Sequence, residues 1–92
     1  MDARFRALPG VELVETGIAD LARGAVTREA LLVSIGAKRL RDIGLDVPEP
    51  PPEAELDLYA LLRSEHGDDA HGRYNALVRR LVSFERAAEC AS

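Results

Sequence analysis

The sequence has very little aromatic mass and almost no cysteine. It contains no Trp, and two Phe and two Tyr are its only aromatic residues. Thirteen Leu supply most of the large apolar side chains, whereas seven Val and three Ile are too few and too scattered to build several strands. Because Cys90 is the one cysteine, no disulfide can form within the chain. This composition predicts an all-α protein with an aliphatic core, in a reducing compartment.

Long hydrophobic runs are also missing. Uninterrupted runs such as Ala30 to Val33 are far short of the roughly 20 residues that a membrane-spanning helix needs. The first eight residues carry Asp2, Arg4 and Arg6, and no apolar stretch of a signal peptide follows them. Eleven Arg against one Lys, with fourteen Ala and no Gln, are typical of a GC-rich bacterial genome. We therefore expect a cytoplasmic bacterial protein that has no membrane partner.

Proline is concentrated at a single point in the middle of the chain. Four prolines in five residues exclude a helix interior and favour an extended connector: Pro48, Pro50, Pro51 and Pro52. The halves on either side each hold about two helices' worth of apolar surface, which is too little for an independent domain. We therefore predict one helical domain, residues 1–92, whose two halves pack on each other.

Apolar residues recur at spacings of three and four in four stretches of the chain. The predicted helices span residues 11–23, 28–43, 53–66 and 69–89, and Thr27 is suited to cap the second of them. Their short connections predict a compact four-helix bundle or array, with the Pro-rich connector between its halves.

Two glycines fall inside the predicted helices. Gly17 costs its helix about 1 kcal/mol relative to Ala, and the usual compensation is the close approach of another helix. Gly36 either lies at a close crossing within one continuous helix or hinges two short helices. We prefer the continuous helix, and the sequence leaves both arrangements open.

One cluster of potential metal ligands occurs, between the third and fourth predicted helices: His66, Asp68, Asp69 and His71. Gly67 is predicted to break the helix between the two histidines, whereas zinc sites commonly place two His at i and i+4 on one helical face. A capped, solvent-exposed turn is therefore the preferred interpretation. We expect no metal, no cofactor and no catalytic residue. A metal-dependent enzyme that uses the His66–His71 segment remains the third functional hypothesis.

The arginines of the last predicted helix suggest nucleic acid as a partner. They are spread around that helix instead of gathering on one face: Arg73, Arg79, Arg80 and Arg86. Residues 45–69 carry eight negative charges and one positive charge, and the net charge of the chain is −4, so the long-range field opposes phosphate binding. We do not expect nucleic acid as a partner. A small regulator that contacts nucleic acid through Arg-rich helix faces is the second hypothesis.

Glu85 is the most informative single residue of the sequence. It lies one turn beyond Leu81, within the apolar stripe of the last predicted helix. Its carboxylate is either exposed past the edge of the core or buried beside a partner, because an unpaired buried charge costs several kcal/mol. Arg39, Arg41 and Arg63 are the candidates for a buried ion pair with Glu85.

The apolar content of 47% is high for a chain that can build one small core, which predicts apolar surface left over for a partner. We expect Leu77 and Leu81 in the core, with Val82 about 100° to one side of Leu81 on the helical wheel and Phe84 about 60° to the other side. The candidate interaction surface consists of Val82, Phe84, Arg79 and Arg80. The leading hypothesis is therefore a non-enzymatic helical protein–protein interaction module that forms a homodimer or binds another protein.

Overall fold

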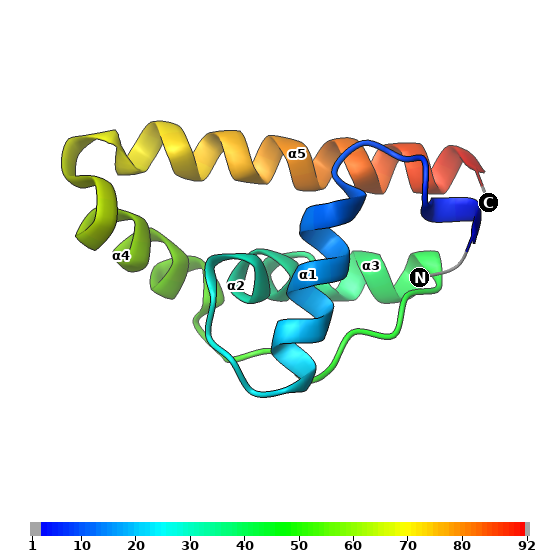
Figure 1. Ribbon diagram of the computed structural model, residues 1–92, viewed down its shortest axis with the longest axis horizontal. Helices are drawn as coiled ribbons and strands as arrows, with labels where there is room; N and C mark the ends of the chain where they lie inside the picture. The colour runs from blue at the N-terminus through cyan, green and yellow to red at the C-terminus, as the bar shows by residue number, and fades with distance from the viewer. Residues whose placement is uncertain (1–2, 92) are drawn as a thin grey trace.

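The computed structural model describes residues 3–91, and all regular structure within that range is helical (Figure 1). The elements are, in order, η1 (Ala3–Phe5), α1 (Val11–Ala22), α2 (Arg28–Ile35), α3 (Ala37–Ile43), α4 (Ala54–His66), η2 (Gly67–Asp69) and α5 (Ala70–Ala91). The predicted all-α class is confirmed, and the helices form a compact array.

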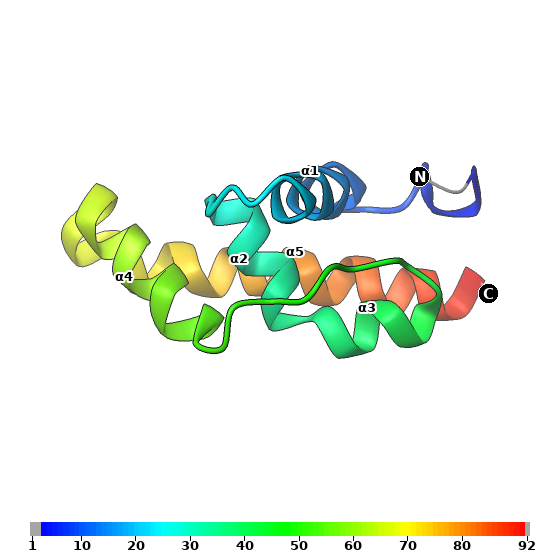
Figure 2. The same cartoon turned by 90° about the horizontal axis from the view of Figure 1, so that it is seen from below.

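The longest helix, α5, runs the length of the molecule, and the other helices lie against it or against one another (Figure 1). At one end η2 turns the chain from α4 into α5, while α3 lies beside the C-terminal half of α5 (Figures 1 and 2). The crossing of α1 over α2 forms the most extensive contact between helices. Since α2 also contacts α4 and α5, the two halves of the chain pack on each other as expected.

An extended segment containing the Pro-rich connector runs back from α3 to the start of α4 (Figure 2). Arg41 holds it in place, because its Nε donates to the carbonyl oxygen of Val47 at 2.9 Å and its Nη2 donates to that of Pro48 at 3.0 Å. Val47 itself is buried in the core. The Pro-rich connector thus links the two halves of the chain and is itself held against the core.

The core is aliphatic, with one contact between two fully buried aromatic rings. Its largest fully buried aliphatic side chains come from α1, α2, α3 and α4: Val14, Leu31, Leu32, Val33, Leu40, Leu58 and Leu62. Leu81 is buried as predicted, whereas Leu77 is only partly buried at the edge of the core. Phe84 is fully buried, and its ring centroid lies 6.0 Å from that of Phe5 in η1. The prediction that Phe84 belongs to an interaction surface is therefore corrected, because η1 covers it.

The predicted helix over residues 28–43 is in fact two helices. Gly36, at φ −97° and ψ 14°, separates α2 from α3, so the hinged alternative holds and the continuous helix is wrong. Figure 2 shows α3 leaving in a different direction from α2. This change of direction places α3 alongside α5.

Two sequence features of the α1–α2 contact are confirmed. A Cβ on Gly17 would collide with the carbonyl oxygen of Glu29 and lie 2.6 Å from Cγ1 of Val33, so only glycine lets the two helices approach this closely. Thr27 caps α2, since its hydroxyl accepts a hydrogen bond from the backbone N–H of Ala30 at 3.1 Å. The α1–α2 corner is therefore closed by backbone packing and by a local cap.

Candidate functional site

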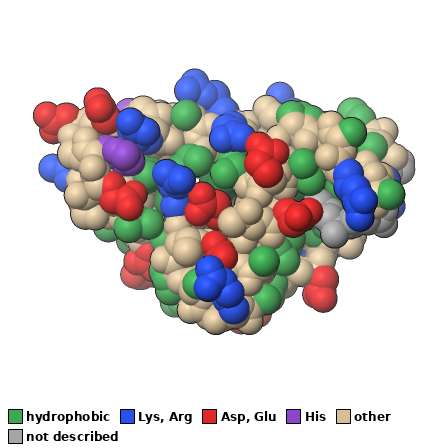
Figure 3. Space-filling view, viewed as in Figure 1, with side chains coloured by type: hydrophobic (Ala, Val, Ile, Leu, Met, Phe, Trp, Pro, Cys, Tyr) green, Lys and Arg blue, Asp and Glu red, His purple; other side chains and the backbone are tan. Residues whose placement is uncertain are grey.

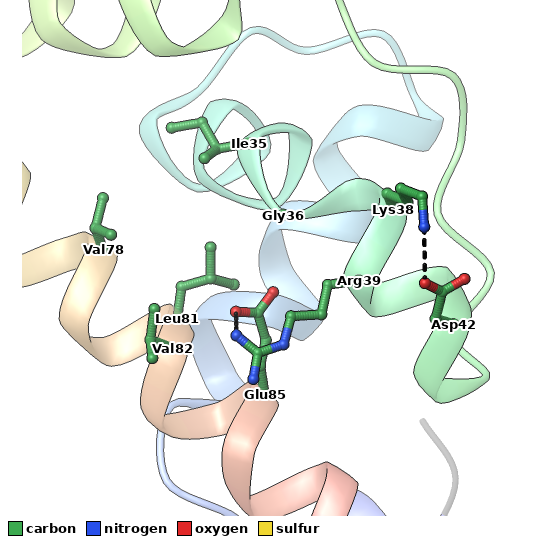
Figure 4. Close-up of a pocket in the computed structure, with 9 residues that line it drawn as sticks. All are labelled: Ile35, Gly36, Lys38, Arg39, Asp42, Val78, Leu81, Val82 and Glu85. Atoms are coloured by element: carbon green, nitrogen blue, oxygen red, sulfur yellow. Dashed lines mark hydrogen bonds and ion pairs between the residues drawn. The ribbon is translucent and has the colours of Figure 1, made fainter.

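An open groove of about 470 Å³ lies between the α2–α3 break and one side of α5 (Figure 4). We call it the α3–α5 groove. Its apolar part consists of Ile35, Gly36, Val78, Leu81 and Val82, and its charged part consists of Lys38, Arg39, Asp42 and Glu85. An apolar centre bordered by charges is the usual anatomy of a protein contact surface.

Helical spacing explains why these α5 residues share one side. Val78, Val82, Glu85 and Glu89 follow one another at intervals of three and four. From α3, Arg39 extends toward Glu85 across the groove (Figure 4). The groove is thus framed by two helices whose polar residues meet at one end.

Gly36 makes room for the carboxylate of Glu85. A Cβ at this position would lie 2.7 Å from Oε2 of Glu85 and 3.0 Å from Cδ2 of Leu81. Both distances are shorter than ordinary van der Waals contact, so a side chain here would push α5 residues out of place. The close crossing and the helix break proposed for Gly36 therefore occur together.

Glu85 is buried, with 3% of its surface exposed, and its Oε1 accepts a hydrogen bond from Nη1 of Arg39 at 3.3 Å. Burial raises the pKa of this carboxyl, the positive charge of Arg39 lowers it, and the negative charge of Glu89 raises it further. Arg39 is thus the partner, out of the three arginines considered. Arg41 binds the connector instead, and Arg63 is exposed.

Arg39 forms ion pairs with two carboxylates, those of Glu85 and Glu89, and it lies closer to that of Glu89. Its Nη2 and Nε donate to Glu89 at 2.6 and 3.0 Å, both shorter than its 3.3 Å bond to Glu85. These bonds lower the pKa of Glu89 and raise that of Arg39. The buried carboxylate of Glu85 therefore has the longer and weaker ion pair with Arg39.

The second oxygen of Glu85 lies against Gly36. Within residues 3–91, its Oε2 accepts no hydrogen bond, while Oε1 contacts Arg39. No side-chain oxygen or nitrogen in the described chain is both fully buried and without a hydrogen bond. Oε2 is therefore not completely buried, although only 3% of the surface of Glu85 is exposed.

The predicted interaction residues are not brought together on one surface. Val82 is half-buried and lines the groove, and Arg79 is exposed. Arg80 instead ties α5 to α1, because its Nη2 lies 2.6 Å from Oε1 of Glu12. Sequence reasoning missed Ile35, Gly36 and Val78 as parts of the surface, since their proximity depends on how α2 and α3 cross α5.

The His66–His71 segment is a turn with no assembled set of ligands. Nε2 of His71 lies 3.2 Å from the side-chain amide of Asn75, and His66 lies at the end of α4 beside Glu65. Between residues 3 and 91, no group of three or more His, Cys, Asp or Glu side chains is placed to hold a metal ion.

The arginines do not form a continuous basic surface on the face seen in Figure 3, where Lys and Arg side chains alternate with Asp and Glu. Several are committed to carboxylates within the chain, as shown by Arg23 with Asp20, Arg39 with Glu89 and Arg80 with Glu12. Phosphate binding needs a concentration of uncompensated positive charge. The geometry therefore adds nothing to the nucleic-acid hypothesis.

Comparison with known proteins assigns no family and no function to the chain. The chain matches no protein-family model, no curated protein and no solved structure. Among residues 3–91, no helix combines the length and the apolar character needed to cross a bilayer.

Proposed function

We propose that this chain is a non-enzymatic protein-interaction module that associates with a second copy of itself through the α3–α5 groove. The observation that carries the proposal is the composition of the groove, in which half-buried Ile35, Val78 and Val82 adjoin a buried acid. Apolar side chains left partly in water favour association, since covering them contributes about 25 cal/mol per Å².

The position of Val82 supports a symmetric contact. It lies on the long helix α5, so the same surface of a second copy can approach it about a twofold axis. A twofold contact closes after two copies, in contrast to a head-to-tail contact, which continues into rings or fibres. We therefore expect a dimer with α5 at its centre.

Sedimentation at micromolar concentration tests this proposal. We expect about twice the chain mass of 10.0 kDa for the unmodified protein. Val82→Glu should give a folded monomer, because it places a charge at the apolar centre without entering the core. Ser83→Glu is the matched control, since Ser83 is exposed and lies outside the groove.

A single species near 10 kDa at every concentration of the unmodified protein would overturn the proposal. A dimer that withstands Val82→Glu would equally contradict the groove as its interface. Circular dichroism of both variants shows whether the helices remain formed.

A further inference from the structure

A second hollow lies where the N-terminal half of α5 faces α2 and α4 (Figure 1). We call it the arginine pocket. Its volume is about 150 Å³, and its lining consists of Arg28, Leu62, Arg73, Ala76, Leu77 and Arg80. The charged residues of this lining are all arginines and the others are all apolar. The pocket shares no residue with the α3–α5 groove.

Helical spacing and the packing of the two halves of the chain bring these arginines together. Arg73 and Arg80 lie seven residues apart, with Ala76 and Leu77 between them on the same side of α5. Arg28 is the first residue of α2, which contacts both α4 and α5. Three guanidinium groups from distant parts of the chain therefore border one small apolar surface.

The positive charge of the pocket is only partly compensated within the chain. Arg28 donates to its neighbour Glu29 at 3.2 and 3.4 Å. Nη2 of Arg80 donates to Glu12 at 2.6 Å. Within residues 3–91, the side chain of Arg73 makes no hydrogen bond or ion pair. After the two ion pairs are counted, the positive charge of Arg73 remains.

Hydrogen-bond donors remain on all three arginines. A guanidinium has five N–H donors, and the bonds above use two of those on Arg28, one on Arg80 and none on Arg73. Two further acids lie near: Asp69 is four residues before Arg73, and Glu65 borders a neighbouring hollow together with Arg28. Neither forms an ion pair with an arginine of the described chain. These acids lower the local potential, but they leave the donors of the pocket unoccupied.

We infer that the arginine pocket binds the carboxylate of a small organic acid and holds the apolar body of that acid against Ala76 and Leu77. Planar guanidinium groups match a carboxylate in shape and can donate two parallel hydrogen bonds to it. One carboxylate also supplies the single negative charge that Arg73 lacks. A cavity of about 150 Å³ holds a guest about the size of benzene, so the acid is a small one.

A titration with benzoate, followed by nuclear magnetic resonance of the unmodified protein, tests this inference. Benzoate joins one carboxylate to an apolar ring, and we expect a dissociation constant of about millimolar size. Benzamide has the same ring without the charge and should bind at least about tenfold more weakly. Acetate has the charge without the ring and should also bind more weakly. Equal affinity for benzoate and benzamide would overturn the site, and so would equal affinity for benzoate and acetate.

Arg73→Ala removes the guanidinium that no internal carboxylate compensates. It should weaken benzoate binding at least about tenfold. Arg79→Ala is the matched control, because Arg79 is also exposed on α5 and lies outside the pocket. It removes the same charge and should change the affinity by less than about twofold. Equal effects of the two substitutions would mean that benzoate is attracted only by the overall charge, and the pocket would be refuted.

Ala76→Gln fills the pocket without changing the charge. Ala76 is exposed, so the longer side chain enters the pocket and not the core. We expect it to weaken benzoate binding at least about fivefold. Ala60→Gln is the control, since Ala60 is exposed on α4 and does not line the pocket. Unchanged binding in Ala76→Gln would contradict the proposed position of the acid.

The acid site and the proposed dimer can be tested separately. Val82→Glu changes the α3–α5 groove and should leave benzoate binding within about twofold of that of the unmodified chain, because the two sites share no residue. Benzoate binding to a monomeric chain would support the pocket and refute only the dimer. If Val82→Glu abolished benzoate binding while Arg73→Ala kept it, the acid would bind in the groove and this inference would be wrong.

Discussion

Two helix crossings in this protein each contain a glycine, and only one of them is closed. At the α1–α2 corner, Gly17 faces the backbone of Glu29, and the helices meet without leaving space. Between the α2–α3 break and α5, Gly36 faces the side chains of Leu81 and Glu85, and a groove remains beside them. The same residue type thus makes room for a helix backbone in one place and for a buried carboxylate in the other.

The acids beside these crossings differ in the same way. Asp20 accepts hydrogen bonds from the hydroxyl of Thr27 at 2.7 Å and from Arg23 at 2.8 and 3.1 Å, which lower its pKa. Among residues 3–91, Glu85 accepts a single hydrogen bond, from Arg39 at 3.3 Å, and burial raises its pKa. Asp20 therefore accepts more and shorter hydrogen bonds than Glu85 does. This difference supports the proposed interface at the groove.

The largest effect on stability is expected on the core side of α5, and it is compared with a substitution on the groove side of the same helix. Phe84→Ala should lower the free energy of unfolding by about 3–5 kcal/mol, because it leaves a cavity beside Phe5. Val82→Ala should cost less than about 1 kcal/mol in the monomer, since Val82 is already partly in water. Urea denaturation, at protein concentrations low enough to keep the chain monomeric, measures both changes in the free energy of unfolding. Equal losses would mean that the groove side of α5 is as closely packed as the core side.

An intermediate effect is expected at the closed crossing. Gly17→Ala should cost about 2–3 kcal/mol, because the new methyl group meets the backbone of Glu29 and a methyl group of Val33. Gly72→Ala provides the control, since nothing lies within 4 Å of its Cβ position and the change should raise the free energy of unfolding by up to about 1 kcal/mol. The same denaturation measurement applies. A stabilising Gly17→Ala would show that the α1–α2 contact is looser than described.

Sequence reasoning found what depends on short-range pattern and missed what depends on the packing of distant segments. Thr27 and Gly17 could be interpreted because a cap and a helix interior are set by neighbouring residues. Phe84 could not, because its cover comes from Phe5, which lies in a short 3-10 turn that has no helical periodicity. Its burial becomes visible only when the N-terminal segment is placed against α5.

The candidate site, too, could be predicted from the sequence only in part. The position of Glu85 within an apolar stripe was enough to predict a carboxylate that needs a partner if it is buried. Choosing Arg39 from three arginines required the turn at Gly36, which brings α3 alongside α5 across 46 positions of sequence. The groove itself exists only because α2 and α3 change direction there, and no local pattern distinguishes that break from a continuous helix.

The smallest expected effect is a pair of opposite pH responses from the two acids. The pKa of Asp20 is lowered below its ordinary value of 3.8, so its stabilising contribution is complete above that pH and is lost as the pH falls further. The pKa of Glu85, which faces Arg39 and Glu89, is raised above its ordinary value of 4.5. Its contribution is therefore complete below pH 4.5 and is lost as the pH rises through the raised pKa.

Asp20→Asn and Glu85→Gln remove these responses one at a time. As the pH falls below 3.8, the unmodified protein should lose stability relative to Asp20→Asn. As the pH falls from 7 toward 4.5, it should gain stability relative to Glu85→Gln, because protonation removes a buried charge that the amide never carries. Thermal denaturation of the monomeric proteins across this range measures both differences. If the two differences changed in the same direction, the ion pair with Arg39 would outweigh the burial of Glu85, and its carboxylate would be as fully compensated as that of Asp20.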